Sequence, residues 1–128
     1  VMLMLGGMHL LAVGAAMGVE VDMTRFVLVA TGALFVVIGN YLPKVRPNYM
    51  VGIRTPWTLA SDRSWTRTHR VGGRVFVIEG VALALLGLVG MTGVAIVAAL
   101  LGAIAILLVV TFATSYQVWK ADPEKRTP

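Results

Sequence analysis

The sequence predicts an all-α integral membrane protein: a bundle of four transmembrane helices with a cytoplasmic Pro/Arg/Trp-rich loop and a short amphipathic helix. Of the 128 residues, 58% are hydrophobic and only 13% are charged, whereas soluble domains carry roughly 25% charged residues. The mean hydropathy is +0.84. The apolar residues also fall into four long blocks, so that lipid must supply most of their environment. We therefore expect a single transmembrane domain over residues 1–128.

Four segments are long enough to cross a bilayer. A spanning helix needs about 20 mostly apolar residues, because the hydrocarbon core is about 30 Å thick and a helix rises about 1.5 Å per residue. The expected spans are residues 1–19, 26–42, 72–90 and 94–116. Short connections join the first pair and the last pair, so each pair is expected to form an antiparallel hairpin. The long loop, residues 43–71, separates the two hairpins.

The first segment begins at Val1, already inside an apolar run, which predicts a processed or truncated chain with a further segment upstream. A signal peptide is the alternative interpretation. However, no basic residues precede the apolar run, which continues through Glu20 and Asp22 into the next one. We expect a spanning helix here.

Lysine and arginine predict the orientation, since they are enriched in cytoplasmic connections. Of the two short connections, only the first carries a basic residue, Arg25. The loop and the tail, residues 117–128, hold Lys44, Arg46, Arg54, Arg63, Arg67, Arg70, Lys120, Lys125 and Arg126. Loop, tail and both termini are therefore predicted to be cytoplasmic. We attribute the net charge of +5 to the basic residues that set this membrane orientation, and we expect no direct nucleic-acid partner.

An amphipathic helix is expected to lead from the loop into the third span. Ser61 or Asp62 is the expected N-cap. At 100° per residue one sector holds Arg63, Arg67, Arg70 and Arg74, and the opposite sector holds Trp65, His69, Gly72 and Phe76. The arginines are expected to lie on the anionic headgroups of the lipid bilayer. Docking of an acidic protein partner is the alternative.

Glu79 is the most costly polar residue, because it lies about 7 to 8 Å along the helix axis beyond Arg74. An unpaired carboxylate at this depth costs about 3 kcal/mol or more. Its partner is expected from another segment; the candidates are His9, Asn40, Arg54, Thr111, Thr114 and Ser115. With His9 and Asn40 it would form a polar layer under the loop. That layer would be a ligand-binding or proton-sensing site, or an anchor for the loop arginines.

No cofactor or metal site is predicted. Cysteine is absent, which excludes disulfides and thiolate ligands. His9 and His69 are expected at different depths, which disfavours a bis-histidine haem. No nucleophile with a base and no phosphate-binding loop is recognisable, so we predict no enzymatic activity. Small-residue rows such as Gly14 to Gly18 and Ala98 to Gly102 indicate helix packing within the bundle.

The loop carries an extended motif. It reads GNYLPKVRPNYMVGIRTPWTL from Gly39 to Leu59, and Trp65, Thr68-His69-Arg70 and Gly72-Gly73 follow. This pattern strongly resembles the C-terminal SdpI region of the SdpI family of bacterial membrane proteins, and the resemblance covers essentially the whole chain. Many members have two further spans ahead of this region. The motif positions that the resemblance carries over are Asn48, Gly52, Arg54, Thr55, Pro56, Trp57, Trp65, His69 and Arg70.

The resemblance implies an immunity or sensing protein of the bacterial inner membrane. The best-known member protects its producer from a secreted toxic peptide and holds a transcriptional repressor at the membrane. The partners implied are a membrane-active toxin peptide and a cytoplasmic repressor docked on the loop. The alternative function is a structural accessory subunit of a larger membrane complex. A transporter or enzyme in which Glu79 and His9 handle protons is a third, less supported interpretation.

Overall fold

The computed structural model describes residues 1–18, 22–48, 50–90 and 93–127, and these residues form helices and no strand, which confirms the predicted all-α class. The elements are α1 (Met2–Ala16), α2 (Met23–Tyr41), the 3-10 turn η1 (Leu42–Lys44), α3 (Pro56–Leu59), α4 (Asp62–Val89) and α5 (Val94–Lys120). Glu20, Met91 and Thr92, which belong to the two short connections, lie outside the described residues.

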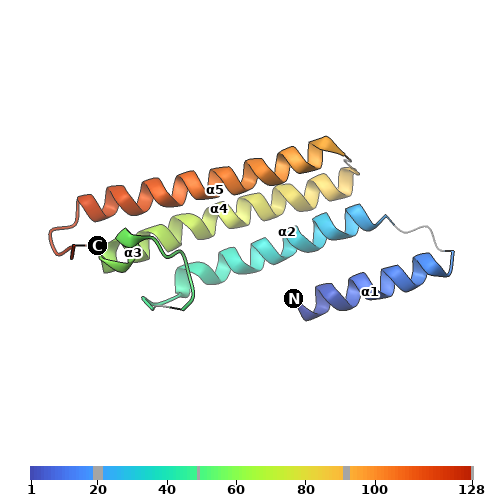
Figure 1. Ribbon diagram of the computed structural model, residues 1–128, viewed down its shortest axis with the longest axis horizontal. Coiled ribbons are helices and arrows are strands. Elements are labelled where there is room, and N and C mark those ends of the chain that lie inside the picture. Colours follow the sequence, from blue (N-terminus) through green and yellow to red (C-terminus); the bar gives the residue numbers. More distant parts are fainter. Residues whose placement is uncertain (19–21, 49, 91–92, 128) are drawn as a thin grey trace.

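The four long helices lie side by side in one layer, in the order α1, α2, α4, α5 (Figure 1). Helix α4 packs on α2 along one side and on α5 along the other. Among the described residues, α1 meets α2 but neither α4 nor α5, and α2 does not meet α5. The helical bundle is therefore an open layer, in which α4 is the element that holds the others together.

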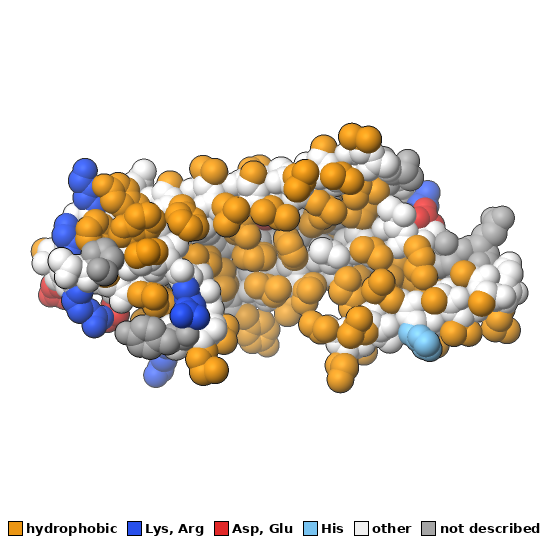
Figure 2. All heavy atoms as spheres, viewed as in Figure 1, with side chains coloured by type: hydrophobic (Ala, Val, Ile, Leu, Met, Phe, Trp, Pro, Cys, Tyr) orange, Lys and Arg blue, Asp and Glu red, His pale blue; other side chains and the backbone are white. Residues whose placement is uncertain are grey.

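Among the described residues, three helical segments are long and apolar enough to span a membrane: Met23–Lys44, Asp62–Val89 and Val94–Lys120, with mean hydropathies of 1.9, 1.8 and 3.0 in their most apolar stretches. Helix α1 is apolar but has only 15 residues. Apolar side chains cover most of the face shown in Figure 2, and α5 buries only Thr111 and Ser115. So much exposed apolar surface is stable in lipid rather than in water. The chain is a helical membrane protein.

A seam of glycines brings α2 and α4 together. A Cβ atom on Gly39 would lie 2.6 Å from the carbonyl oxygen of Gly73, and one on Gly80 would lie 2.5 Å from that of Gly32. Only glycine permits such close contact between helix backbones. The small-residue rows expected to pack do not do so at Gly18 and Gly102, where an added Cβ would meet none of the described residues within 4 Å.

Helix α4 is continuous from the amphipathic segment into the apolar segment, as expected. Ser61 is its N-cap, because its side chain accepts a hydrogen bond from the backbone N–H of Ser64. The helix ends at Gly90, whose φ of +79° is the left-handed conformation that glycine adopts without strain.

The loop and the C-terminal tail lie at one end of the layer, and the C-terminal ends of α1 and α4 lie at the other (Figure 1). The tail is tied to the start of α4: the backbone N–H of Arg126 donates to the carbonyl of Ala60 over 2.9 Å. The Ser61 hydroxyl donates to Asp122 over 2.5 Å. The chain therefore forms two antiparallel hairpins whose basic ends face the same way.

Candidate functional site

The first part of the motif shapes a turn. The side-chain oxygen of Asn48 accepts hydrogen bonds from the backbone N–H groups of Met50 and Val51, over 2.8 and 2.7 Å, and its amide donates to the carbonyl of Arg46. Such side-chain bonds to nearby backbone are the reason that asparagine favours turns. Gly52 follows with a φ of +123°, and a Cβ there would overlap the His69 ring. The backbone of this turn therefore depends on the side-chain hydrogen bonds of Asn48 and on the absence of a side chain at Gly52.

The second part of the motif builds the short helix α3. Thr55 and Thr58 form a capping box: the Thr55 hydroxyl accepts from the backbone N–H of Thr58, and the Thr58 hydroxyl accepts from that of Thr55. Pro56 occupies the first helical position, where its missing N–H is no loss. The Thr58 hydroxyl also donates to the carbonyl of Ile53 over 2.9 Å. Thr58 is therefore a structural residue of the loop.

Trp65 and His69 of α4 hold the loop in place; both are 1% exposed. The Trp65 indole N–H donates to the carbonyl of Val45, and Nε2 of His69 accepts from the backbone N–H of Ile53, each over 2.9 Å. The two rings stack with their centroids 4.1 Å apart. We call these four residues, Val45, Ile53, Trp65 and His69, the loop–α4 junction.

The junction fixes the protonation state of His69. Because Nε2 accepts a hydrogen bond, the ring proton must sit on Nδ1, which lies 2.9 Å from the carbonyl oxygen of Trp65. The imidazole is therefore neutral, and both of its nitrogens are used. The stacked partner of this ring, Trp65, is buried under the loop.

Trp57 ties α3 to α5. Its ring packs edge to face on Phe112 and Tyr116, with centroid distances of 6.1 and 5.2 Å. Such aromatic pairs contribute about 0.5–1.5 kcal/mol each beyond the area they bury. Together with the junction, Trp57 fixes the loop to both helices of the second hairpin.

Arg54 and Arg70 are the two motif residues left without such a role. Both are exposed. The ion pairs of the described residues are Arg25 with Asp22 and Arg126 with Asp62. Among the motif residues, the guanidinium groups of Arg54 and Arg70 are therefore the ones available to a ligand or partner.

Comparison with known proteins decides the family. The model of the SdpI/YfhL protein family matches residues 44–115. This chain belongs to the SdpI/YfhL protein family. The immunity protein SdpI of Bacillus subtilis (strain 168) is 28% identical over 105 residues, which are 82% of this chain and 50% of that protein. The chain thus spans about half the length of this curated relative. No solved structure matches this chain.

The SdpI/YfhL match contains all nine motif positions. Seven of them shape the loop or hold it against α4 and α5: Asn48, Gly52, Thr55, Pro56, Trp57, Trp65 and His69. The SdpI motif of this chain is therefore first of all a folding motif for the loop. Sequence reasoning missed Thr58, because the usual capping-box signature has Glu or Gln three residues after the capping Ser or Thr, and this loop has threonine there.

The expected polar layer does not form. Glu79 is 8% exposed, and neither of its carboxylate oxygens has a hydrogen-bond partner among the described residues. His9 is exposed on α1, which does not meet α4 in the described part of the chain. The Asn40 amide is exposed and donates to the carbonyl of Val36 in its own helix. The layer fails because α1 lies at the edge of the open layer.

None of the other expected partners forms a hydrogen bond with Glu79 among the described residues. The hydroxyls of Thr111 and Ser115 donate to backbone carbonyls of their own helix, α5. Arg54 forms no ion pair with Glu79. The Thr68 hydroxyl, eleven residues before Glu79 on the same face of α4, is likewise buried without a partner in the described residues.

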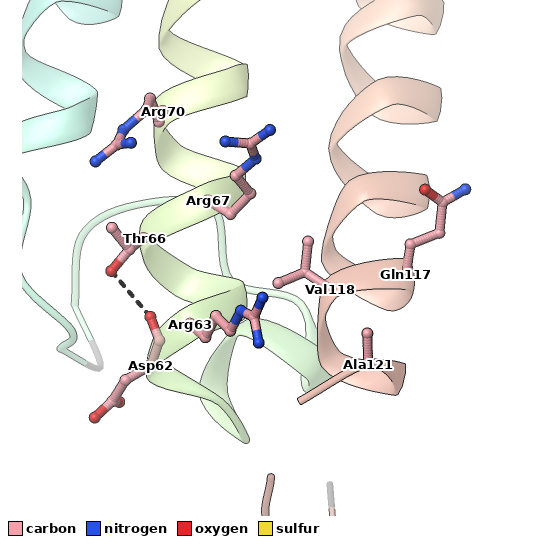
Figure 3. A pocket seen from close by; sticks show the side chains of 8 residues that line it. All are labelled: Asp62, Arg63, Thr66, Arg67, Arg70, Gln117, Val118 and Ala121. Atoms are coloured by element: carbon pink, nitrogen blue, oxygen red, sulfur yellow. Dashed lines mark hydrogen bonds between the residues drawn. The ribbon is translucent and has the colours of Figure 1, made fainter. Parts of the chain in front are cut away.

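Two of the grooves that the described residues line flank α4 beside the loop end. The larger, of about 820 Å³, is lined by Asp62, Arg63, Thr66, Arg67, Arg70, Gln117, Val118 and Ala121. Figure 3 shows Arg63 and Arg67 directed toward α5 and Arg70 directed toward α2. The smaller, of about 360 Å³, lies between α2 and α4 and is lined by Gly39, Asn40, Pro43, Arg70, Gly73, Arg74, Val77 and Ile78.

Proposed function

We propose that this SdpI/YfhL protein is a non-catalytic immunity protein of the bacterial inner membrane, with its loop and both termini in the cytoplasm. Membership of the family and the similarity to a protein named for immunity support this role. The clustering of lysine and arginine at the loop end supports the orientation.

The observation that carries the proposal is that the family motif builds a loop held rigidly against α4 and α5 through Trp57, Trp65 and His69. A rigid surface loses little conformational entropy when a partner binds. We propose that the apolar helices meet a membrane-active toxin peptide. The loop then presents the exposed guanidinium of Arg54 to a cytoplasmic regulator.

Complementation tests this function. We expect the full chain, expressed in a Bacillus subtilis strain that lacks its immunity protein SdpI, to restore survival against the toxic peptide. The His69→Phe variant, which loses the bond to Ile53, should protect less at equal abundance in the membrane. The control Arg46→Gln alters an exposed side chain and should protect fully. No protection by an abundant wild-type chain would refute the proposal.

A second candidate function is a structural subunit of a larger membrane complex. It is favoured by the open layer, because α5 has Thr111 and Ser115 as its buried residues and leaves a long apolar face uncovered. Purification in a gentle detergent distinguishes the two functions. Stoichiometric retention of other subunits would favour this second role, and a free monomer or homodimer would count against it.

A further inference from the structure

A row of arginines runs along α4 on the side turned away from the loop–α4 junction. Its members are Arg63, Arg67, Arg70 and Arg74, all exposed. Within the described ranges, none of them forms an ion pair. Uncompensated charges in a row create a local positive potential that attracts anions.

The four arginines differ in their surroundings. Arg63 lies near Asp122, whose pKa is held below its ordinary value first by the hydrogen bond from Ser61, then by the backbone of Glu124, with a smaller contribution from Arg63. Arg63 is thus partly balanced by this carboxylate. The uncompensated charge is centred on Arg67, Arg70 and Arg74.

The groove between α2 and α4 has both charged and apolar lining residues. Arg70 and Arg74 belong to the charged turns of α4, Val77 and Ile78 follow in its apolar part, and Asn40 lines the groove from α2. Its volume of about 360 Å³ falls within the roughly 300–1,000 Å³ typical of small-ligand sites. The α4 residues of the groove lie where this helix passes from its charged turns into its apolar turns. The groove therefore suits an amphiphile.

Its floor is built into the helix packing. Gly39 and Gly73 bring the backbones of α2 and α4 into contact beneath the groove, and a side chain at either position would overlap the opposite helix. The close approach holds the α4 backbone that carries Arg70 and Arg74 next to α2. The groove is thus present before any ligand binds, which lowers the cost of binding.

We propose that this groove binds an anionic phospholipid of the surrounding bilayer, with the phosphate on Arg70 and Arg74 and an acyl chain along Val77 and Ile78. A guanidinium group matches two phosphate oxygens at once. Basic pockets between transmembrane helices on the cytoplasmic side are known to take such headgroups. The combination of arginines and apolar wall in one groove favours a lipid over an acidic protein segment. This site goes beyond the proposed immunity function and does not depend on it.

Lipid titration of the purified full chain in a zwitterionic detergent, followed by native mass spectrometry, tests the site. We expect short-chain phosphatidylglycerol to bind at least about tenfold more tightly than phosphatidylcholine with the same chains, since two arginines distinguish the headgroups at about fivefold each. The Arg70→Gln/Arg74→Gln variant should lose this preference. The matched control Arg46→Gln/Arg54→Gln removes the same charge from exposed loop positions outside the groove and should keep it.

Three outcomes would overturn the proposal. One is equal binding of the two lipids by the wild-type chain. Another is an equal loss of preference in the control variant, which would indicate unspecific attraction by net charge. The third is a soluble competitor that displaces the bound lipid as effectively as phosphatidylglycerol does. Glycerol phosphate with this effect would make the groove a site for free phosphate, and a glutamate-rich peptide with this effect would make it a protein-docking site. A circular dichroism spectrum of each variant checks that it is folded.

Discussion

The imidazole of His69 accepts a hydrogen bond from the backbone N–H of Ile53, sixteen residues earlier in the chain, over 2.9 Å. This hydrogen bond joins the loop to α4. Gly52 lies next to the imidazole ring, and its lack of a side chain leaves room for that ring. A second hydrogen bond, from the Trp65 indole to the Val45 carbonyl, holds the earlier half of the loop against α4. The loop of this SdpI/YfhL protein is therefore a folded part of the helical layer, and the consequences can be measured.

Replacing His69 by phenylalanine tests the hydrogen bond itself. The ring can still stack on Trp65, but the N–H of Ile53 loses its acceptor. An unsatisfied donor costs about 1–3 kcal/mol, so we expect the free energy of unfolding in detergent to fall by that amount. Limited proteolysis should cut the loop faster. An unchanged unfolding free energy and cleavage rate would mean that the bond does not hold the loop.

Gly52→Ala should destabilise the chain, because φ is +123° and the added Cβ would overlap His69. We expect a loss of more than about 1 kcal/mol in thermal unfolding. Gly102→Ala is the matched control: its Cβ would meet nothing within 4 Å in α5. Alanine favours a helix by roughly 0.5–1 kcal/mol over glycine, so the control should be neutral or stabilising. Equal effects of the two changes would contradict this account of Gly52.

Glu79→Gln should leave folding and protection intact. The carboxylate has no hydrogen-bond partner among the described residues, so the change removes a charge without breaking a bond. We expect an unfolding temperature equal to or above that of the wild type, measured in the same detergent. A large loss of stability would reveal a partner for Glu79. A loss of protection by a stable variant would support a proton-handling role instead.

Acid should release the C-terminal tail. The Ser61 hydrogen bond holds the pKa of Asp122 below its ordinary value of 3.8, so the carboxylate stabilises the folded tail fully above that pH. The contribution is lost as the pH falls through the lower pKa of the folded state. The fluorescence of Trp119, whose indole N–H donates to Arg126, reports the tail. Asp122→Asn should lack the acid step, and an identical step in both chains would exclude Asp122 as its source.

Much of the helical framework follows from local sequence. Apolar segments of sufficient length predict the spans, and the position of Ser61 predicts the start of α4. The placement of Trp65 and His69 opposite the arginine row follows from helical periodicity and agrees with their burial. These features depend on interactions within a few residues.

Features that depend on distant segments were not predicted. Nothing local pairs Trp65 with Val45, or sets α1 at the edge of the layer, out of reach of Glu79. The glycine seam did leave a signal that was overlooked. Gly73, Gly80 and Gly87 recur every seven residues, and Gly32 and Gly39 have the same spacing in the facing helix. A spacing of seven returns each glycine to nearly the same helix face.

Amide hydrogen exchange at Ile53, measured on the full chain in a bilayer, tests most directly whether the loop is held by α4. We predict strong protection of this amide in the wild type and its loss in His69→Phe, because His69 Nε2 is the acceptor of the Ile53 N–H among the described residues. Exchange of the wild-type Ile53 amide at the rate of an unstructured peptide would contradict the loop–α4 junction.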